Sequence, residues 1–221
     1  MCTVPPPTRP RLATLRHLER RLSDTVAAIL CGGQSRRMGQ DKALVEIDGQ
    51  PLVARIADRC HRGGINSVVA VGGSRAPLEA LGIPWITDRW PGAGPLGGII
   101  TALGASTPDS LVYIVAVDVP GLPPDAVHQT VAALAADPTA DVALPLTADG
   151  RRHHLQGAWR PRTAPVLERL FDHGERAVRR CLSDLAVADV TGLDPSSFTD
   201  VDTPEDLAAW TRGHGNTSPD R

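Results

Sequence analysis

The chain has 221 residues, of which 42% are hydrophobic and 22% are charged, and its formal net charge is −2. This composition is typical of a globular protein with one sizeable core, and the weak net charge argues against bulk binding of nucleic acid. No apolar run approaches the length of a membrane span, so we expect no membrane protein. The four cysteines, at positions 2, 31, 60 and 181, form no Cys-x-x-Cys pair, which indicates reduced thiols and a cytoplasmic location.

The first 24 residues are rich in proline and arginine and lack the apolar segment of a secretory signal. Four leucines spaced three or four residues apart leave two interpretations open there, a short amphipathic helix and a flexible basic extension. We expect residues 25–212 to form a single domain and residues 213–221 to be a disordered tail.

Continuous apolar runs predict buried strands at Val26–Leu30, Ser67–Val71, Pro84–Thr87, Leu111–Val117 and Val142–Pro145. Helical patterns between them predict helices at Pro51–Arg62, Leu96–Ala105 and Pro124–Ala136, and a last helix begins at Pro204 with Thr203 as its cap. This alternation predicts a three-layer α/β/α sandwich around a mostly parallel, Rossmann-like sheet. In such folds ligands bind beyond the carboxyl ends of the strands.

The segment after the first strand is the most informative part of the chain. Residues 30–42 read Leu-Cys-Gly-Gly-Gln-Ser-Arg-Arg-Met-Gly-Gln-Asp-Lys. This is neither a P-loop nor the dinucleotide fingerprint, because the glycines and the lysine have the wrong spacing for both. Glycines let the backbone approach a ligand, and the cations supply charge, so the segment predicts a pocket for nucleotide phosphates. The alternative is a glycine turn with solvated arginines.

Three further segments follow predicted strands or precede the last helix. Asp88 opens a loop that continues to Gly94-Pro95-Leu96-Gly97-Gly98; this is a binding loop, a helix start with glycines for close packing, or both. Asp118 comes directly after the apolar strand ending at Val117, where it suits a metal ion or a strand-end turn. Asp200-Val-Asp202-Thr-Pro-Glu-Asp leads into the first turn of the last helix.

In this order, the four segments resemble those of the molybdenum cofactor guanylyltransferases, a nucleotidyltransferase family with the nucleotide-diphospho-sugar transferase-like fold. The family pattern for the first segment is Leu-Ala-Gly-Gly-x-Ser-x-Arg-Met-Gly-x-Asp-Lys, and Cys31 replaces its alanine. The late family pattern has asparagines where this chain has Asp200 and Asp202. The resemblance implies transfer of GMP from GTP to the terminal phosphate of molybdenum-molybdopterin, which gives molybdopterin guanine dinucleotide and pyrophosphate.

The resemblance also implies roles for individual residues. Catalysis falls to Arg37, Lys42 and Asp118, with Mg2+ held by Asp118. The nucleotide is bound by Leu30, Cys31, Gly32, Gly33, Lys42, Asp88, Gly94, Pro95, Leu96, Gly97 and Asp118. Asp202 or Asp200 is a second metal ligand, or Asp202 only caps the helix. Arg152 and His154 contact the acceptor or belong to a solvated basic turn, and Gly174–Val178 touches the pterin or starts a helix.

The expected partners are GTP, molybdenum-molybdopterin, and proteins of cofactor insertion and molybdoenzyme maturation. Rival interpretations are a cytidylyltransferase, a sugar-phosphate nucleotidyltransferase, and a non-catalytic protein that escorts the cofactor. The segment from Gly94 to Gly98 favours guanine, since the cytidylyltransferases carry a serine-rich segment there. The short chain argues against an added sugar domain, and the presence of Lys42 and Asp118 argues against a non-catalytic escort.

Overall fold

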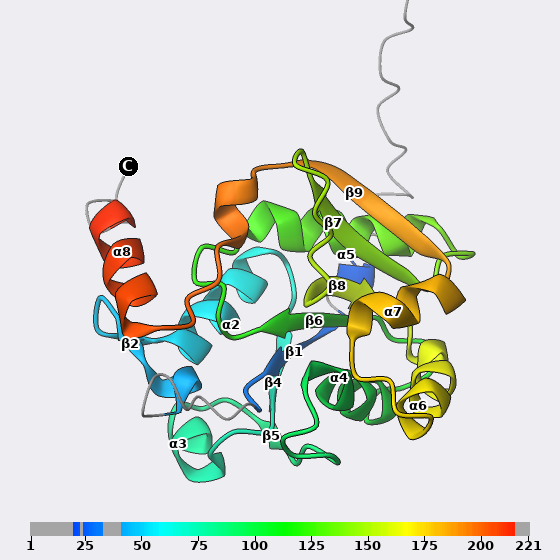
Figure 1. The fold of residues 1–221 in the computed structure, drawn as a ribbon, viewed down its shortest axis with the longest axis horizontal. Helices are drawn as coiled ribbons and strands as arrows, with labels where there is room; N and C mark the ends of the chain where they lie inside the picture. The colour runs from blue at the N-terminus through cyan, green and yellow to red at the C-terminus, as the bar shows by residue number, and fades with distance from the viewer. Residues whose placement is uncertain (1–19, 23, 33–40, 215–221) are drawn as a thin grey trace, which may run out of the picture.

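The computed structural model describes residues 20–22, 24–32 and 41–214. Its main sheet has seven strands in the order β5 (Trp85–Ile86), β4 (Ser67–Val71), β1 (Val26–Leu30), β6 (Val112–Ala116), β8 (Gln156–Trp159), β7 (Val142–Thr147) and β9 (Val187–Leu193). Helices cover both faces of the sheet (Figure 1). The predicted three-layer α/β/α sandwich with a mostly parallel sheet is therefore confirmed.

The four strands β5, β4, β1 and β6 are all parallel. Every residue of β6 and all but the first of β1 are buried, as expected for strands covered on both faces. Along β1, Ala27 and Ile29 enter one hydrophobic cluster, while Ala28 and Leu30 enter the other. This alternation follows from the strand period of two and gives the sheet two separate cores.

The other half of the sheet is mixed, because β8 runs antiparallel to both β6 and β7, whereas β7 and β9 are parallel. Gly157 lets β8 lie close to β7, since a Cβ at this position would be 2.9 Å from the carbonyl oxygen of Ala143. The sequence did not predict β8 or β9. Strand β8 has only four residues and contains Gln156, and β9 has exposed polar positions. Neither strand therefore gives the continuous apolar pattern that predicts a buried strand.

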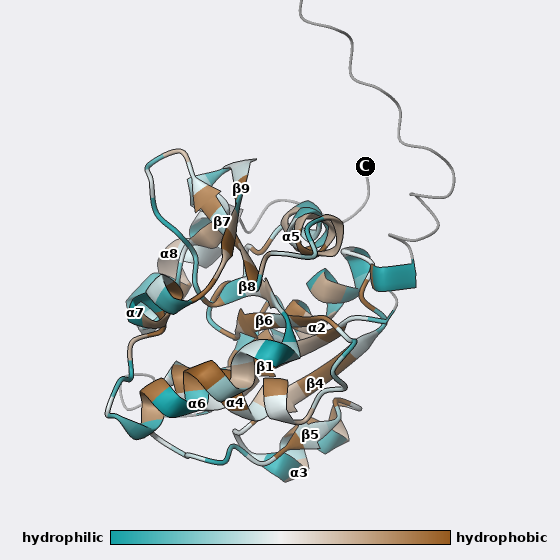
Figure 2. Ribbon diagram, turned by 90° about the vertical axis from the view of Figure 1, so that its right-hand side faces the viewer, coloured by the Kyte–Doolittle hydropathy of each residue, from teal (hydrophilic) through white to brown (hydrophobic). Residues whose placement is uncertain are grey.

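The helices divide between the two cores. The larger core includes residues of α2 (Leu52–Arg62), α5 (Pro124–Ala136) and α8 (Pro204–His214), and the smaller includes those of α4 (Pro95–Gly104), α6 (Ala164–Asp172) and α7 (Val178–Cys181). Figure 2 shows hydrophobic residues along the strands and hydrophilic ones mainly on the outer sides of helices. The predicted helices α2, α4 and α5 are confirmed within one residue at each end. Predictions for residues 1–19 and 215–221 lie outside the described part of the chain.

Shorter elements complete the structure: the hairpin β2 (Glu46–Ile47) and β3 (Gln50–Pro51), helix α3 (Arg75–Ala80), and the 3-10 turns η1 (Lys42–Leu44), η2 (Pro161–Thr163), η3 (Leu182–Asp184) and η4 (Pro195–Phe198). No helix among the residues that the structure describes is long and apolar enough to cross a membrane.

The topology gathers distant segments at one edge of the sheet. The parallel strands β1, β4, β5 and β6 all end there, and the residues before β8 lie at the same edge because β8 is antiparallel to β6. The segment before α8 joins them, since the N–H of Val201 donates to the carbonyl oxygen of Asp118 at 2.8 Å. The functional residues predicted from the sequence therefore approach one another at this edge.

Candidate functional site

Three charged side chains from distant segments meet at the carboxyl edge of the sheet. Nζ of Lys42 lies 2.6 Å from Oδ1 of Asp202 and 3.4 Å from Oδ2 of Asp118. Lys42 begins η1, Asp118 follows β6, and Asp202 precedes α8. The lysine side chain is only 13% exposed, so its ammonium group is largely enclosed beside the two carboxylates. Three residues that were singled out separately in the sequence thus form one charged cluster.

The ionisation of the Asp118 carboxyl depends on its surroundings. Burial raises the pKa of Asp118 above its usual value, Lys42 lowers it in part, and Asp200 and Asp202 raise it further. Its ionised form therefore depends on positive charge nearby.

The donor set at this cluster fits Mg2+, which prefers hard carboxylate oxygens and usually takes only one or two of them. Asp118 and Asp202 already share one cation, the ammonium of Lys42. Within the described ranges, no group of three or more His, Cys, Asp or Glu side chains is arranged to hold a metal ion. A metal bound here would take its remaining ligands from water and substrate phosphates.

The start of the glycine-rich loop is packed against the neighbouring strand. The N–H groups of Cys31 and Gly32 both donate to the carbonyl oxygen of Val71, at 3.0 and 3.1 Å. The sequence assigned these two N–H groups to the nucleotide, but in this conformation they are used within the protein. Gly33 and Arg37 lie outside the described residues.

Cys31 and Asp41 lie on either side of residues 33–40 in the chain. Burial raises the pKa of the Cys31 thiol, so the group stays protonated and serves as a small buried residue, not as a nucleophile. Asp41 accepts hydrogen bonds from the N–H groups of Ala43 at Oδ1 and Ser74 at Oδ2, both at 3.1 Å. Asp41 therefore fixes the turn that presents Lys42 and ties it to the loop after β4.

Asp88 is buried at the end of β5 with one oxygen held by the protein. Its Oδ1 accepts hydrogen bonds from the N–H of Trp90 at 3.0 Å and from Oγ1 of Thr101 at 3.3 Å. Its Oδ2 faces the glycine loop, because a Cβ at Gly32 would lie 3.3 Å from it. Asp88 and Gly32, both assigned to the nucleotide, are therefore neighbours.

The segment 94–98 combines the two roles left open by the sequence. Gly94 precedes α4 with φ 91°, and both Gly94 and Pro95 are exposed. Leu96 is fully buried, and Gly97 and Gly98 allow close packing, because added Cβ atoms would lie 3.3 Å from Trp90 Cβ and 3.1 Å from Leu30 Cδ2. Gly94 and Pro95 are the accessible part of this segment.

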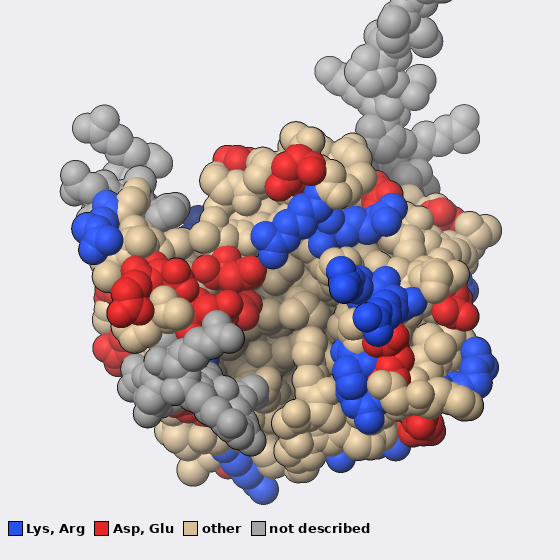
Figure 3. Space-filling view, in the orientation of Figure 1, with Lys and Arg blue, Asp and Glu red and all other residues tan. Residues whose placement is uncertain are grey.

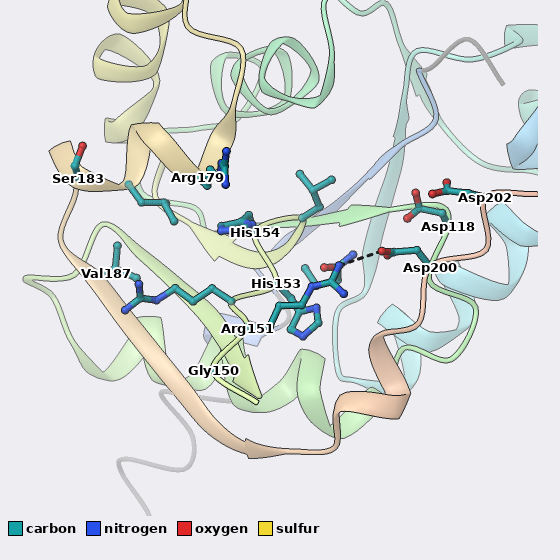
Figure 4. A pocket seen from close by; sticks show the side chains of 14 residues that line it. Asp118, Gly150, Arg151, His153, His154, Arg179, Ser183, Val187, Asp200 and Asp202 are labelled. Carbon is teal, nitrogen blue, oxygen red and sulfur yellow. Dashed lines mark hydrogen bonds and ion pairs between the residues drawn. The ribbon is translucent and has the colours of Figure 1, made fainter. Parts of the chain in front are cut away.

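A pocket of about 840 Å³ opens beside the charged cluster. Asp118, Asp200 and Asp202 lie on one side of it, and His154 and Arg179 on the other (Figure 4). Figure 3 shows acidic side chains gathered on one side of a hollow in this face and basic side chains on the other. The pocket thus has an acidic end beside Lys42 and a basic end beside α7.

The two residues that the sequence assigned to the acceptor both line this pocket. Arg152 forms a two-point ion pair with Asp189 on β9, with N–O distances of 2.6 and 2.7 Å, and this pairing raises the pKa of Arg152. Burial lowers the pKa of His154, and Arg152, Arg151 and Arg179 lower it further. The neutral histidine therefore lies in a positive field, which suits an anionic ligand.

Asp200 and Asp202 have different partners. Asp200 accepts from Nη2 of Arg151 at 3.1 Å, whereas Asp202 pairs with Lys42. Neither caps α8: Oγ1 of Thr203 accepts from the N–H of Asp206, and Oδ2 of Asp206 accepts from the N–H of Thr203. The predicted Thr203 cap is confirmed, and Asp202 remains available as a second metal ligand.

Sequence reasoning missed Arg179 and Asp189 and gave Arg151 no role. Arg179 lies in the four-residue helix α7, and Asp189 lies in β9. Neither element has a sequence motif that would mark these residues as functional. Only their contacts with the pocket and with Arg152 identify them.

The chain is similar to known nucleotidyltransferases over most of its length. The model of the MobA-like NTP transferase domain matches residues 27–190. A molybdenum cofactor guanylyltransferase of Rhodobacter capsulatus is 37% identical over 185 residues, which cover 81% of this chain and 91% of that protein.

Two solved structures share the fold. Molybdopterin-guanine dinucleotide biosynthesis protein A of Archaeoglobus fulgidus has a TM-score of 0.70 and 23% identity, covering 87% of this chain and 100% of that chain. A manganese complex of Rv0371C from Mycobacterium tuberculosis has a TM-score of 0.63 and 19% identity, covering 84% and 96%. The family model and the Rhodobacter relative together show that this chain belongs to the MobA-like NTP transferases, in the molybdenum cofactor guanylyltransferase family.

Proposed function

We propose that the protein transfers GMP from GTP to the terminal phosphate of molybdenum-molybdopterin, releasing pyrophosphate and molybdopterin guanine dinucleotide. The observation that carries this proposal is the cluster of Lys42, Asp118 and Asp202 at the acidic end of a pocket whose other end is basic. In a member of this family, the phosphates would react at the acidic end, beside Lys42, and the anionic acceptor would bind at the basic end.

The nucleophile needs little activation. A phosphate monoester has a second pKa near ~6, so the acceptor phosphate is already largely ionised at neutral pH. It attacks the α-phosphorus of GTP in line, and the bond to the β-phosphate oxygen breaks as pyrophosphate leaves. The obstacle is repulsion between anions, so positioning and positive charge carry the catalysis.

Lys42 is the described cation best placed for this task. Its ammonium group is held by Asp118 and Asp202, and in this proposal it exchanges a carboxylate partner for a phosphate oxygen when the triphosphate binds. We assign Arg37 the same role from the sequence pattern alone. Asp88, together with exposed Gly94 and Pro95, receives the nucleotide base and ribose in this proposal.

Asp118 and Asp202 would hold Mg2+, which when bound neutralises negative charge on the triphosphate and the leaving group. Asp200 is not assigned to the metal, because it is paired with Arg151. The choice of Mg2+ over another divalent ion is part of the proposal, and competition between Mg2+ and Mn2+ for the purified protein tests it.

Arg152 and His154 would contact the acceptor, with Arg179 beside them in the pocket. Arg152 is held in place by Asp189 and keeps a positive charge at all relevant pH values. We also expect a cytoplasmic location, as the scattered cysteines of the sequence suggested, and contacts with proteins of cofactor insertion and molybdoenzyme maturation.

The test is pyrophosphate release by the purified protein with molybdenum-molybdopterin, Mg2+, and GTP, CTP or ATP offered separately. Release with GTP alone, abolished in Asp118→Ala, is the expected result. Release with CTP would keep the mechanism and overturn the assignment of guanine. No release with any nucleotide, from a protein that binds GTP, would favour a different acceptor or a non-catalytic escort.

A further inference from the structure

Four side chains outside the pocket form a continuous stack beside α4 and α6, which we call the aromatic ladder: Arg89, Trp90, Phe171 and Arg176. The guanidinium carbon of Arg89 lies 4.2 Å from the ring centroid of Trp90, and that of Arg176 lies 3.8 Å from the ring of Phe171. The two rings are 5.0 Å apart and tilted by 49°. Cation–π and tilted aromatic contacts are both favourable, so the four groups hold one another in orientation.

Both ends of the aromatic ladder are attached to α6. Nη1 of Arg89 lies 2.6 Å from Oε1 of Glu168, and Nη1 of Arg176 donates to the carbonyl oxygen of Phe171 at 2.6 Å. Phe171 itself is buried with 4% exposure. The helix therefore provides a fixed base for the aromatic ladder.

The aromatic ladder also reaches the loop assigned to the base. The N–H of Trp90 donates to Oδ1 of Asp88 at 3.0 Å, and the Trp90 side chain packs on Gly97, leaving 3.3 Å for an added Cβ. The orientation of Trp90 is thus linked to that of Asp88, whose second oxygen faces Gly32.

The loop between Trp90 and α4 contains one turn, in which the N–H of Ala93 donates to the carbonyl oxygen of Trp90 at 3.0 Å, and a glycine lies on each side of Ala93. Gly92 and Gly94 both have positive φ, at 80° and 91°, and both are exposed. Glycine in such positions leaves many backbone conformations open, so contacts from outside the loop help to select one. A preorganised loop binds its ligand more tightly, because the ordering cost is met before binding.

We propose that the aromatic ladder is a positioning element that fixes the loop of residues 88–98 for the guanine base, with Arg176 as its outer clamp. This inference rests on the proposed function, since guanine is assigned to that loop there. It also gives the Gly174–Val178 segment a role without ligand contact. Glu175 Oε1 accepts from the N–H groups of Arg176 and Ala177 at 2.8 Å, which fixes the backbone of Arg176 just before α7.

The main variant is Arg176→Ala, with Arg169→Ala as the matched control. Arg169 is an exposed arginine on α6, the helix that carries Phe171, and it lies outside the aromatic ladder. We expect Arg176→Ala to raise KM for GTP about three- to ten-fold, the range for loss of a cation–π contact and its hydrogen bonds. The kcat at saturating GTP and the KM for the acceptor should not change, and preference for GTP over ATP should fall.

Two further variants separate positioning from general stability. Arg176→Lys keeps a cation over the ring and should recover part of the GTP affinity. Phe171→Leu removes the ring but keeps an apolar side chain, so it should weaken GTP binding more than Arg176→Ala. Calorimetric titration with GTP alone measures binding without the acceptor, and thermal unfolding shows whether each variant is folded at the assay temperature.

The outcomes are distinct. An unchanged GTP affinity in folded Arg176→Ala and Phe171→Leu would overturn the aromatic ladder as a positioning element while leaving the proposed function intact. An equal loss in Arg169→Ala would also overturn it, because the effect would then be one of net charge. A wild-type protein without preference for GTP would overturn the proposed function itself, and the inference with it.

Discussion

The parallel half of the sheet, β5–β4–β1–β6, and the mixed half, β8–β7–β9, bring opposite charges to the same pocket. The parallel half and the turn after β1 supply Asp118 and Lys42, with Asp202 joining them from the chain end. The mixed half and α7 supply Arg152, paired with Asp189, and Arg179. One end has two carboxylates that share the ammonium group of Lys42, and the other has arginines, of which Arg152 is paired with Asp189.

This difference suggests a division of work. A cation between two carboxylates can exchange them for a metal ion or a phosphate during the reaction. An arginine that is held in place by an ion pair, as Arg152 is, suits lasting recognition of an anion. Variants of the parallel half should therefore change turnover, and variants of the mixed half should change acceptor affinity. The predictions below test this division, from the largest expected effect to the smallest.

Lys42→Ala should lower kcat by about 10²–10³-fold, the range for loss of a charge that stabilises a transition state. The measurement is pyrophosphate release at saturating GTP and acceptor. Arg62→Ala, which removes an exposed cation from the outer end of α2, is the control and should keep wild-type turnover. Wild-type kcat in folded Lys42→Ala would remove this lysine from the mechanism.

Arg152→Ala should raise KM for the acceptor about ten-fold or more, as expected when a charged hydrogen bond is lost, and leave KM for GTP unchanged. Arg162→Ala is a matched control, because Arg162 also pairs with an aspartate, at 2.9 Å from Asp141, but does not line the pocket. An equal change in both variants, or a change in kcat alone, would contradict the proposed division.

Asp202→Asn restores the asparagine of the family pattern and removes one charge from the cluster around Lys42. We expect Mn2+, used as a spectroscopic probe, to bind about five-fold more weakly, because ligand charge sets affinity for divalent ions. Electron paramagnetic resonance of free Mn2+ measures this. Asp200→Asn is the control, since Asp200 pairs with Arg151, and it should bind Mn2+ as the wild type does.

Thr203→Ala should lower the free energy of unfolding by about 1 kcal/mol through loss of the α8 cap, with kcat little changed. Thermal or urea unfolding measures this. Thr211→Ala makes the same change inside α8, where the hydroxyl donates to the carbonyl oxygen of Leu207, and should cost less. A large fall in kcat with Thr203→Ala would mean that the cap also positions Asp202.

The parallel half was predictable because its strands are continuous apolar runs, and Val26–Leu30 and Ser67–Val71 were placed to the residue. In the mixed half, β7 was predicted as Val142–Pro145, two residues short of its observed end. β8 and β9 were not predicted, since they draw their stability from neighbours in space and carry weak local patterns. Local motifs likewise identified Lys42, Asp88 and Asp118, because each belongs to a motif that follows a predicted strand. They gave no sign of Asp189 or Phe171.

By itself, the sequence determined the fold class, the family and the chemistry of the residues at the strand ends, because these depend on local pattern and order. The tertiary structure decided how they are paired: that Lys42 bridges Asp118 and Asp202, that Asp200 belongs to Arg151, and that Cys31 and Gly32 donate to the sheet. Pairing depends on distance between segments up to 160 residues apart, and no local pattern encodes that distance.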